Sequence, residues 1–166
     1  MKSTSLAADT YNIDVVLAAN DGEVIPATDI TVDTGVTTTI YAAGGTGGAS
    51  ITPILIENDD LRGVAVYAKL RVLHAHPNVG LVDIHAKAQG VGSFDDSTRV
   101  LEGVDYTKSA VLNVAGGDYD FAVIAPNDNT FTPVISLSGT LEAGGVYTAY
   151  ATEDDGILGL SVDTAP

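Results

Sequence analysis

Apolar and polar side chains alternate along most of this 166-residue chain, and this alternation limits the possible folds more than any other feature. Near the start, Tyr11, Ile13 and Val15 are apolar and the residues between them are polar. A period of two places successive side chains on opposite faces of a β-strand. Because the pattern recurs to the end of the chain, we expect an all-β protein without helices.

Turn signals divide this pattern into short strands. Asn20-Asp21-Gly22 and Pro77-Asn78-Val79-Gly80 are typical of tight turns. Many short strands separated by turns favour an antiparallel Greek-key β-sandwich, immunoglobulin-like or transthyretin-like, over a parallel α/β sheet. We expect strands at residues 11–17, 28–32, 36–42, 51–57, 64–74, 81–87, 99–104, 110–114, 118–125, 134–141, 146–152 and 157–162.

The chain also repeats itself at an offset near ~108 residues, as tandem copies of one supersecondary unit do. Four segments match in order: 6–16 with 114–124, 20–22 with 127–129, 32–35 with 141–144, and 39–42 with 148–151. We therefore expect two domains. Residues 64–166 form a complete β-sandwich repeat, and residues 1–63 correspond only to its rear half.

The front strands of the first repeat, which would correspond to residues 70–76 and 81–87, are missing from residues 1–63. A half-sandwich exposes an apolar face and unpaired strand edges, so something must cover it. The second repeat, strands from another chain, or upstream residues that were removed would each serve. Pairing between chains predicts dimers or filaments, and hence a structural, adhesive or assembly role.

Charge excludes several kinds of partner. Twenty-two Asp and Glu face seven Lys and Arg, which gives a net charge of -15. Such a chain is repelled by nucleic acid and by anionic membrane surfaces, and no apolar run is long enough to span a bilayer. Cysteine is absent, which excludes disulfides and thiol chemistry. The acidity serves solubility or, as the alternative, cation binding.

One segment resembles a known family. Residues 70–85 read LRVLHAHPNVGLVDIH. This run is similar to the R-V-x-H-A-S-P, turn and V-D-V-Y signature of the domain-of-unknown-function 4397 family. The family's later motifs are similar to Gly117-Asp118-Tyr119 and Gly144-Gly145-Val146-Tyr147-Thr148. The resemblance covers most of residues 64–166, and its rear half recurs in residues 1–63.

The resemblance implies location and architecture more than activity. Members are similar to secreted, often tandem, β-sandwich modules of cell-surface proteins, with no established activity. We therefore expect an extracellular, cell-surface protein, although residues 1–9 contain no apolar signal segment. The sequence departs from the family at His76, where Ser is usual, and at His85, where Tyr or another aromatic residue is usual. The roles of these two histidines are not implied by the resemblance.

The candidate metal ligands are His74, His76, Asp83 and His85. If residues 74–76 and 83–85 belonged to one hairpin, these side chains could meet and bind zinc or another divalent ion. The alternative is structural: a buried, hydrogen-bonded His74 and an Asp83 that accepts backbone N–H groups. Acidic loops at residues 59–60, 95–96 and 153–156 lack EF-hand spacing; they are solvated charge or weak calcium sites.

No catalytic motif is evident. The sequence has neither a G-x-S-x-G element nor a cysteine, and nothing places two carboxylates across a cleft. We expect no enzymatic activity. The alternative to a structural role is a glycan- or divalent-cation-binding module, with Tyr41, Tyr147 and Tyr150 available to stack on sugars or to pack in a core or an interface.

Overall fold

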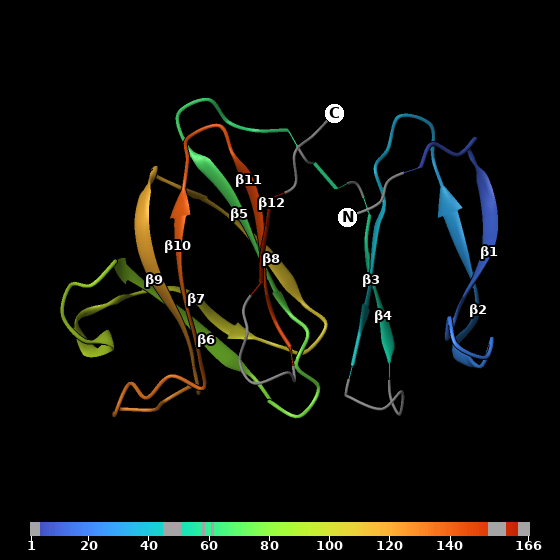
Figure 1. Ribbon diagram of the computed structural model, residues 1–166. Coiled ribbons are helices and arrows are strands. Elements are labelled where there is room, and N and C mark those ends of the chain that lie inside the picture. Colours follow the sequence, from blue (N-terminus) through green and yellow to red (C-terminus); the bar gives the residue numbers. More distant parts are fainter. Residues whose placement is uncertain (1–3, 45–50, 58, 61, 153–158, 163–166) are drawn as a thin grey trace. The chain divides into compact units, whose positions relative to one another are not determined.

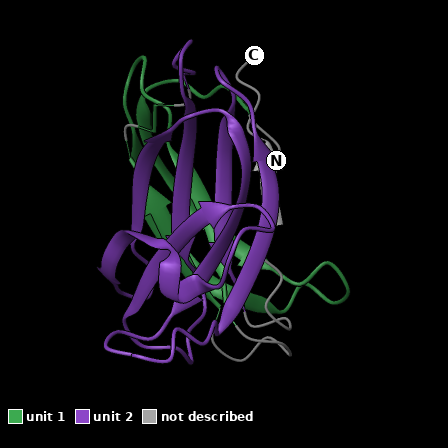
Figure 2. Cartoon of the chain, turned by 90° about the vertical axis from the view of Figure 1, so that its left-hand side faces the viewer, with its two compact units in different colours: residues 1–60 green, residues 61–166 purple. Residues whose placement is uncertain are grey.

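The computed structural model describes residues 4–44, 51–57, 59–60, 62–152 and 159–162. The chain forms two compact units, residues 1–60 and 61–166 (Figures 1 and 2). Nearly every regular element is a strand, and the helical element in the described ranges is the short 3-10 turn η1, Phe94–Asp96. The prediction of an all-β fold is confirmed. Among the described residues, no helix has the length and apolarity needed to cross a membrane.

Unit 2 contains two four-stranded sheets. One has the order β10-β9-β6-β7 and the other the order β12-β11-β5-β8. Neighbouring strands are antiparallel except β5 and β11, which run parallel. The strands are β5 (Ala68–His74), β6 (Val82–Ala88), β7 (Thr98–Val104), β8 (Ser109–Val114), β9 (Gly117–Ile124), β10 (Ile135–Leu141), β11 (Val146–Ala151) and β12 (Gly159–Val162).

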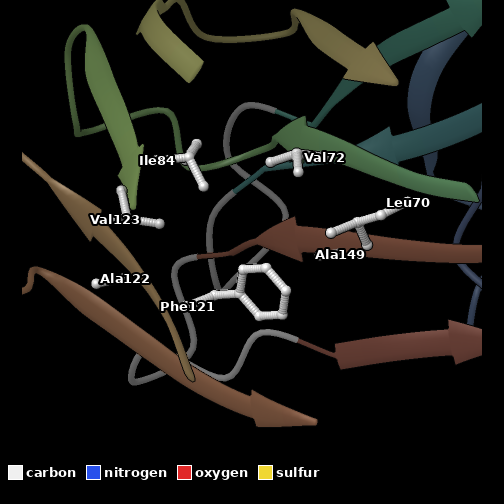
Figure 3. Close-up of a pocket in the computed structure, with 7 residues that line it drawn as sticks. All are labelled: Leu70, Val72, Ile84, Phe121, Ala122, Val123 and Ala149. Atoms are coloured by element: carbon white, nitrogen blue, oxygen red, sulfur yellow. The ribbon is translucent and has the colours of Figure 1, made fainter. Parts of the chain in front are cut away.

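The core of unit 2 lies between these sheets, as the period-two pattern predicts for a β-sandwich. Leu70 and Val72 of β5 face Ile84 of β6 and Phe121 and Val123 of β9 (Figure 3). Each of these five side chains is at most 5% exposed. They line a gap of about 10 Å³, which holds at most a single water molecule. The interior is therefore packed and contains no ligand cavity at this point.

Strand β5 begins later than expected. Residues 64–67 form a tight turn in which the Tyr67 N–H donates to the Val64 carbonyl at 3.0 Å. Pairing with β11 follows, because the Lys69 N–H donates to the Gly145 carbonyl at 2.9 Å. The expectation that residues 64–67 extend the strand was wrong, since alternation of side chains does not specify backbone partners. From Ala68 onward β5 is buried on both faces.

Unit 1 consists of two hairpins (Figure 1). Strands β1 (Asp9–Val16) and β2 (Glu23–Val32) pair antiparallel, as do β3 (Thr39–Ala43) and β4 (Thr52–Ile56). On β2, Ile25 and Ile30 are buried, and they pair in register with Val15 and Tyr11 of β1. The inner face of this hairpin is therefore apolar, as the alternation predicts.

The hairpins of unit 1 have counterparts in unit 2. The Tyr11 hydroxyl donates to the Ala7 carbonyl at 3.0 Å, and the Tyr119 hydroxyl donates to the Ala115 carbonyl at 3.0 Å. The two residues of the first contact, Ala7 and Tyr11, are each 108 positions before their counterparts Ala115 and Tyr119. In both units the contact ties the segment that precedes the strand to the third residue of β1 or β9. The Greek-key connectivity and the tandem-repeat origin stay predictions.

The packed core generates a prediction for stability. Leu70→Ala removes a side chain that is 1% exposed, and should lower the free energy of unfolding of unit 2 by about 2–5 kcal/mol. Val111→Ala, at a side chain that is 53% exposed, should change it by less than about 0.5 kcal/mol. Urea unfolding followed by circular dichroism measures both variants. Equal destabilisation by the two substitutions would contradict a core at this place.

Candidate functional site

His74 closes the turn that follows β5. Its side chain is 2% exposed, and Nε2 lies 2.9 Å from the Gly80 carbonyl oxygen. Nδ1 accepts the His76 N–H at 3.4 Å, which assigns the ring proton to Nε2 as the donor to Gly80. The ring also packs edge-on against Tyr106, with centroids 6.2 Å apart. Both ring nitrogens of His74 are therefore engaged by the protein itself.

His85 lies on β6 and is 6% exposed. Its Nδ1 is 2.9 Å from Ser97 Oγ, and that hydroxyl donates its single proton to the Phe94 carbonyl at 2.5 Å. Ser97 Oγ must then accept from His85, so Nδ1 carries the proton of the neutral ring. Burial lowers the pKa of His85; the Asp83 carboxylate opposes this shift and the Arg99 guanidinium adds to it.

Asp83 fixes an irregularity between β6 and β7. Its carboxylate accepts the Gly103 N–H at 2.8 Å and an Arg99 guanidinium N–H at 3.2 Å. Gly103 has φ +60°, a left-handed conformation that favours glycine, and the pairing of β6 with β7 shifts register next to Asp83. Asp83 thus holds the backbone of a β-bulge in place.

The expected histidine hairpin does not form, because β5 and β6 belong to different sheets. The segment between them crosses from one layer of the sandwich to the other, and alternation of side chains does not reveal such a crossing. His76 is half-buried, and its Nδ1 accepts the Asn78 N–H at 3.3 Å. Within the described residues, no three His, Asp or Glu side chains come together as a metal site. The acidic loop at residues 153–156 lies outside the described residues.

A different feature distinguishes the two units, namely the number of neighbours of the strands that the sequence offset aligns, β1 with β9 and β3 with β11. In unit 2, β9 lies between β10 and β6, and β11 lies between β12 and β5. In the described part of unit 1, β1 pairs with β2 and β3 pairs with β4, and neither has a second strand neighbour. We call these unpaired sides of β1 and β3 the open edges. An open edge presents unpaired N–H and C=O groups on which another strand can form.

Apolar side chains accompany the open edges. Ile40 of β3 and Leu55 of β4 are cross-strand partners, and they are 38% and 41% exposed. Ala149 of β11, which corresponds to Ile40 in the repeat, is 3% exposed and belongs to the core of unit 2. Burial of exposed apolar side chains removes their surface from water and lowers the free energy. Unit 1 therefore carries an apolar surface at a position that is covered in unit 2.

Acidic and basic residues are unevenly distributed along the chain. Residues 3–60 contain nine Asp and Glu and no Lys or Arg. Residues 117–166 likewise contain no Lys or Arg, and six of the seven bases lie between Arg62 and Lys108. We call β5–β8 the front half, and the pairs of hairpins β1–β4 and β9–β12 the rear halves. Five of the seven bases thus lie in the front half, and the rear halves contain acidic residues but no Lys or Arg.

An ion pair joins the two halves in unit 2. Lys87 Nζ of β6 lies 2.8 Å from Asp120 Oδ2 of β9 and 5.1 Å from the centroid of the Phe94 ring. Asp120 also accepts from the Ser138 hydroxyl and the Gly90 N–H. The hydrogen bond from Lys87, followed by those from Ser138 and Gly90, lowers the pKa of Asp120 to about 2. A cation on a front strand is therefore matched to a carboxylate on a rear strand.

The open edges and the division of charge were not predicted as one site. The distribution of Lys and Arg along the sequence is the signal that could have separated the front half from the rear halves.

Comparison with known proteins identifies a family. The family model described as a domain of unknown function, DUF4397, matches residues 2–85. This range contains residues 2–60 of unit 1, β5 and the whole motif of residues 70–85. The resemblance was expected to cover most of residues 64–166, whereas the match ends at residue 85, within β6. No curated protein matches the chain.

The lowered pKa of His85 has a consequence for stability. The unfolded chain takes up a proton at this residue near pH 6.5, before the folded chain does, so stability should fall as the pH drops below about 6.5. An NMR titration should place the pKa of His85 below 6.5. In urea unfolding, His85→Gln should show a smaller loss of stability between pH 7 and pH 5.5 than the original chain. Titration of His85 at or above 6.5 would contradict this account.

Proposed function

This chain belongs to the family described as a domain of unknown function, DUF4397, and from that premise we propose that it is a non-catalytic structural module of the cell surface. In this proposal it acts by assembly: the open edges of unit 1 pair with strands of another chain. The resemblance to secreted modules of cell-surface proteins supports the extracellular location that we propose. The fold is a scaffold in this function, and the backbone of β1 and β3 is the binding surface.

The observation that carries the proposal is the difference in pairing between equivalent strands. β9 and β11 each have two strand neighbours, whereas β1 and β3 each have one in the described residues. Backbone N–H and C=O groups on an open edge are satisfied by water or by a further strand. Addition of a strand supplies a row of backbone hydrogen bonds and places side chains beside the exposed Ile40 of β3.

A non-catalytic role is supported by the structural hydrogen bonds that the buried titratable side chains make. His74 and His85 each engage neighbouring protein groups through their ring nitrogens. Asp83 binds a backbone N–H and a guanidinium. These bonds brace turns and a bulge, and such roles need no substrate. Side chains committed to the fold are poor general acids and bases, because each proton transfer would break a structural hydrogen bond.

The net charge of -15 sets the conditions for assembly. Two copies repel each other at low ionic strength, and the Debye length falls from about 30 Å at 0.01 M salt to about 8 Å at 0.15 M. Salt therefore removes the long-range repulsion while leaving backbone pairing intact. We expect association to strengthen as salt is added, which is opposite to the behaviour of a complex held together by surface ion pairs.

Assembly predicts a defined change in mass. In 0.15 M salt, light scattering coupled to size-exclusion chromatography should show dimers or larger species that increase with protein concentration. The double variant Val16→Lys and Ile40→Lys places charge on β1 and β3 at side chains that are 43% and 38% exposed, and should return the chain to the monomer. Leu81→Lys is the matched control, because Leu81 is an exposed apolar residue outside the strands of unit 2.

The control variant should associate like the original chain. A monomer at every concentration and salt condition would refute assembly through identical copies. Loss of association in Leu81→Lys as well as in the double variant would show that general charge, and not the open edges, controls the mass.

A further inference from the structure

Unit 2 provides an internal template for what pairs with the open edge of β1. There, β6 lies antiparallel on β9, with Lys87 across from Asp120, His85 across from Ala122 and Asp83 across from Ile124. The offset of 108 places Asn12, Asp14 and Val16 of β1 at the positions of those three β9 residues. A strand of the β6 type would therefore align with β1 in a defined register.

The residues of β1 differ from those of β9 in charge. Ala122 of β9 is fully buried, and its counterpart Asp14 is an exposed carboxylate. The carboxylate of Asp120 is replaced by the amide of Asn12, whose Nδ2 donates to Asp29 Oδ1 of β2 at 2.7 Å. The outer face of the β1–β2 hairpin thus carries Asp14 and Asp29, in a unit whose residues 3–60 contain no Lys or Arg.

A cation opposite these carboxylates would have to come from the added strand. Lys87 performs this role toward Asp120 in unit 2, at 2.8 Å. Opposite charges on directly facing residues of neighbouring strands stabilise a sheet, and like charges destabilise it. His85 lies at the position that would face Asp14, so a partner strand suited to β1 carries Lys or Arg there.

The front half of a second copy is not a suitable partner for β1. Each copy has two rear halves and a single front half among its described strands. A copy that gave β5–β8 to its neighbour would uncover its own β9 and β11, so no backbone pairing would be gained. Copies can still pair directly edge to edge, but both strands would then present Asp14, and each chain carries a net charge of -15.

We infer that the open edge of β1 is a docking site for a β6-like strand of a different polypeptide, one that carries Lys or Arg across from Asp14. This inference rests on the proposed function, because it names the partner of the same edge. The occupant pairs antiparallel with β1, places apolar residues toward Ile13 and Val15, and places its cation on the outer face beside Asp14 and Asp29.

A labelled peptide tests this directly. The probe has the sequence of residues 80–90 with His85→Lys, and with Asp83→Val because the partners of Asp83, Gly103 and Arg99, are absent from the peptide. The matched control peptide has His85→Glu. Fluorescence anisotropy measures the binding of each peptide to the full chain in 0.05 M salt. The Lys peptide should bind about fivefold more tightly than the Glu peptide, as expected for exposed cross-strand charges.

Charge reversal on the protein identifies where the peptide binds. Asp14→Lys should reverse the preference, so that the Glu peptide binds more tightly than the Lys peptide. If the peptide instead displaced β6 within unit 2, Asp14→Lys would leave the preference unchanged, and that result would overturn the inference.

Register is tested by disulfide trapping, which is unambiguous because the chain contains no cysteine. Val16→Cys should form a disulfide with a Lys peptide carrying cysteine at position 83, and not with one carrying it at position 84, which faces the other side of the strand. Equal trapping of both peptides, or of neither, would overturn the proposed register and with it the docking site.

The outcomes separate this inference from the proposed function. If the full chain self-associates through its open edges but binds neither peptide, the inference is wrong and assembly through identical copies stands. If the chain binds the Lys peptide with reversal by Asp14→Lys and remains monomeric, the inference stands and self-assembly is wrong. Binding of neither peptide by a chain that also stays monomeric overturns both.

Discussion

Pairing of backbone edges is the constraint on which this structure depends. A strand in the middle of a sheet has its N–H and C=O groups bonded on both sides, and a strand at the edge leaves half of them to water or to a partner. In unit 2, eight strands form two sheets, and the front and rear halves supply each other's central neighbours. In the described part of unit 1, β1 and β3, which the sequence offset aligns with β9 and β11, each have one strand neighbour.

Electrostatics follows the same division. The front half, residues 68–114, holds five of the seven Lys and Arg, and the rear halves contain none. In unit 2 this separation is productive, because Lys87 of the front half binds Asp120 of the rear half and lowers the pKa of that carboxyl. In unit 1 the acidic face lacks a cation from its own residues 3–60. The open edges, the exposed apolar side chains and the negative charge of unit 1 therefore all favour an added strand that carries apolar and basic side chains.

Much of the fold could be predicted from alternation and turn residues. The all-β class and the family were predicted from the sequence, because period-two burial and the motif of residues 70–85 are local features. Two expectations failed because strand partners are not local. Residues 64–67 continue the alternation but form a turn, and the histidine segments lie on strands of different sheets. The site was only partly foreseen. The missing front strands and the match of Asp14 to Ala122 are visible in the sequence offset, whereas the residue that faces this position, His85, required the register of β6 on β9.

Amide hydrogen exchange of the full chain, resolved by NMR, tests the open edge most directly. If β1 is paired on one side, its alternate amides, those that do not bond to β2, should exchange at least about tenfold faster than the corresponding amides of β9, which lies between two strands. Uniform protection along β1, equal to that of β9, would mean that a strand already occupies this edge and would contradict the account.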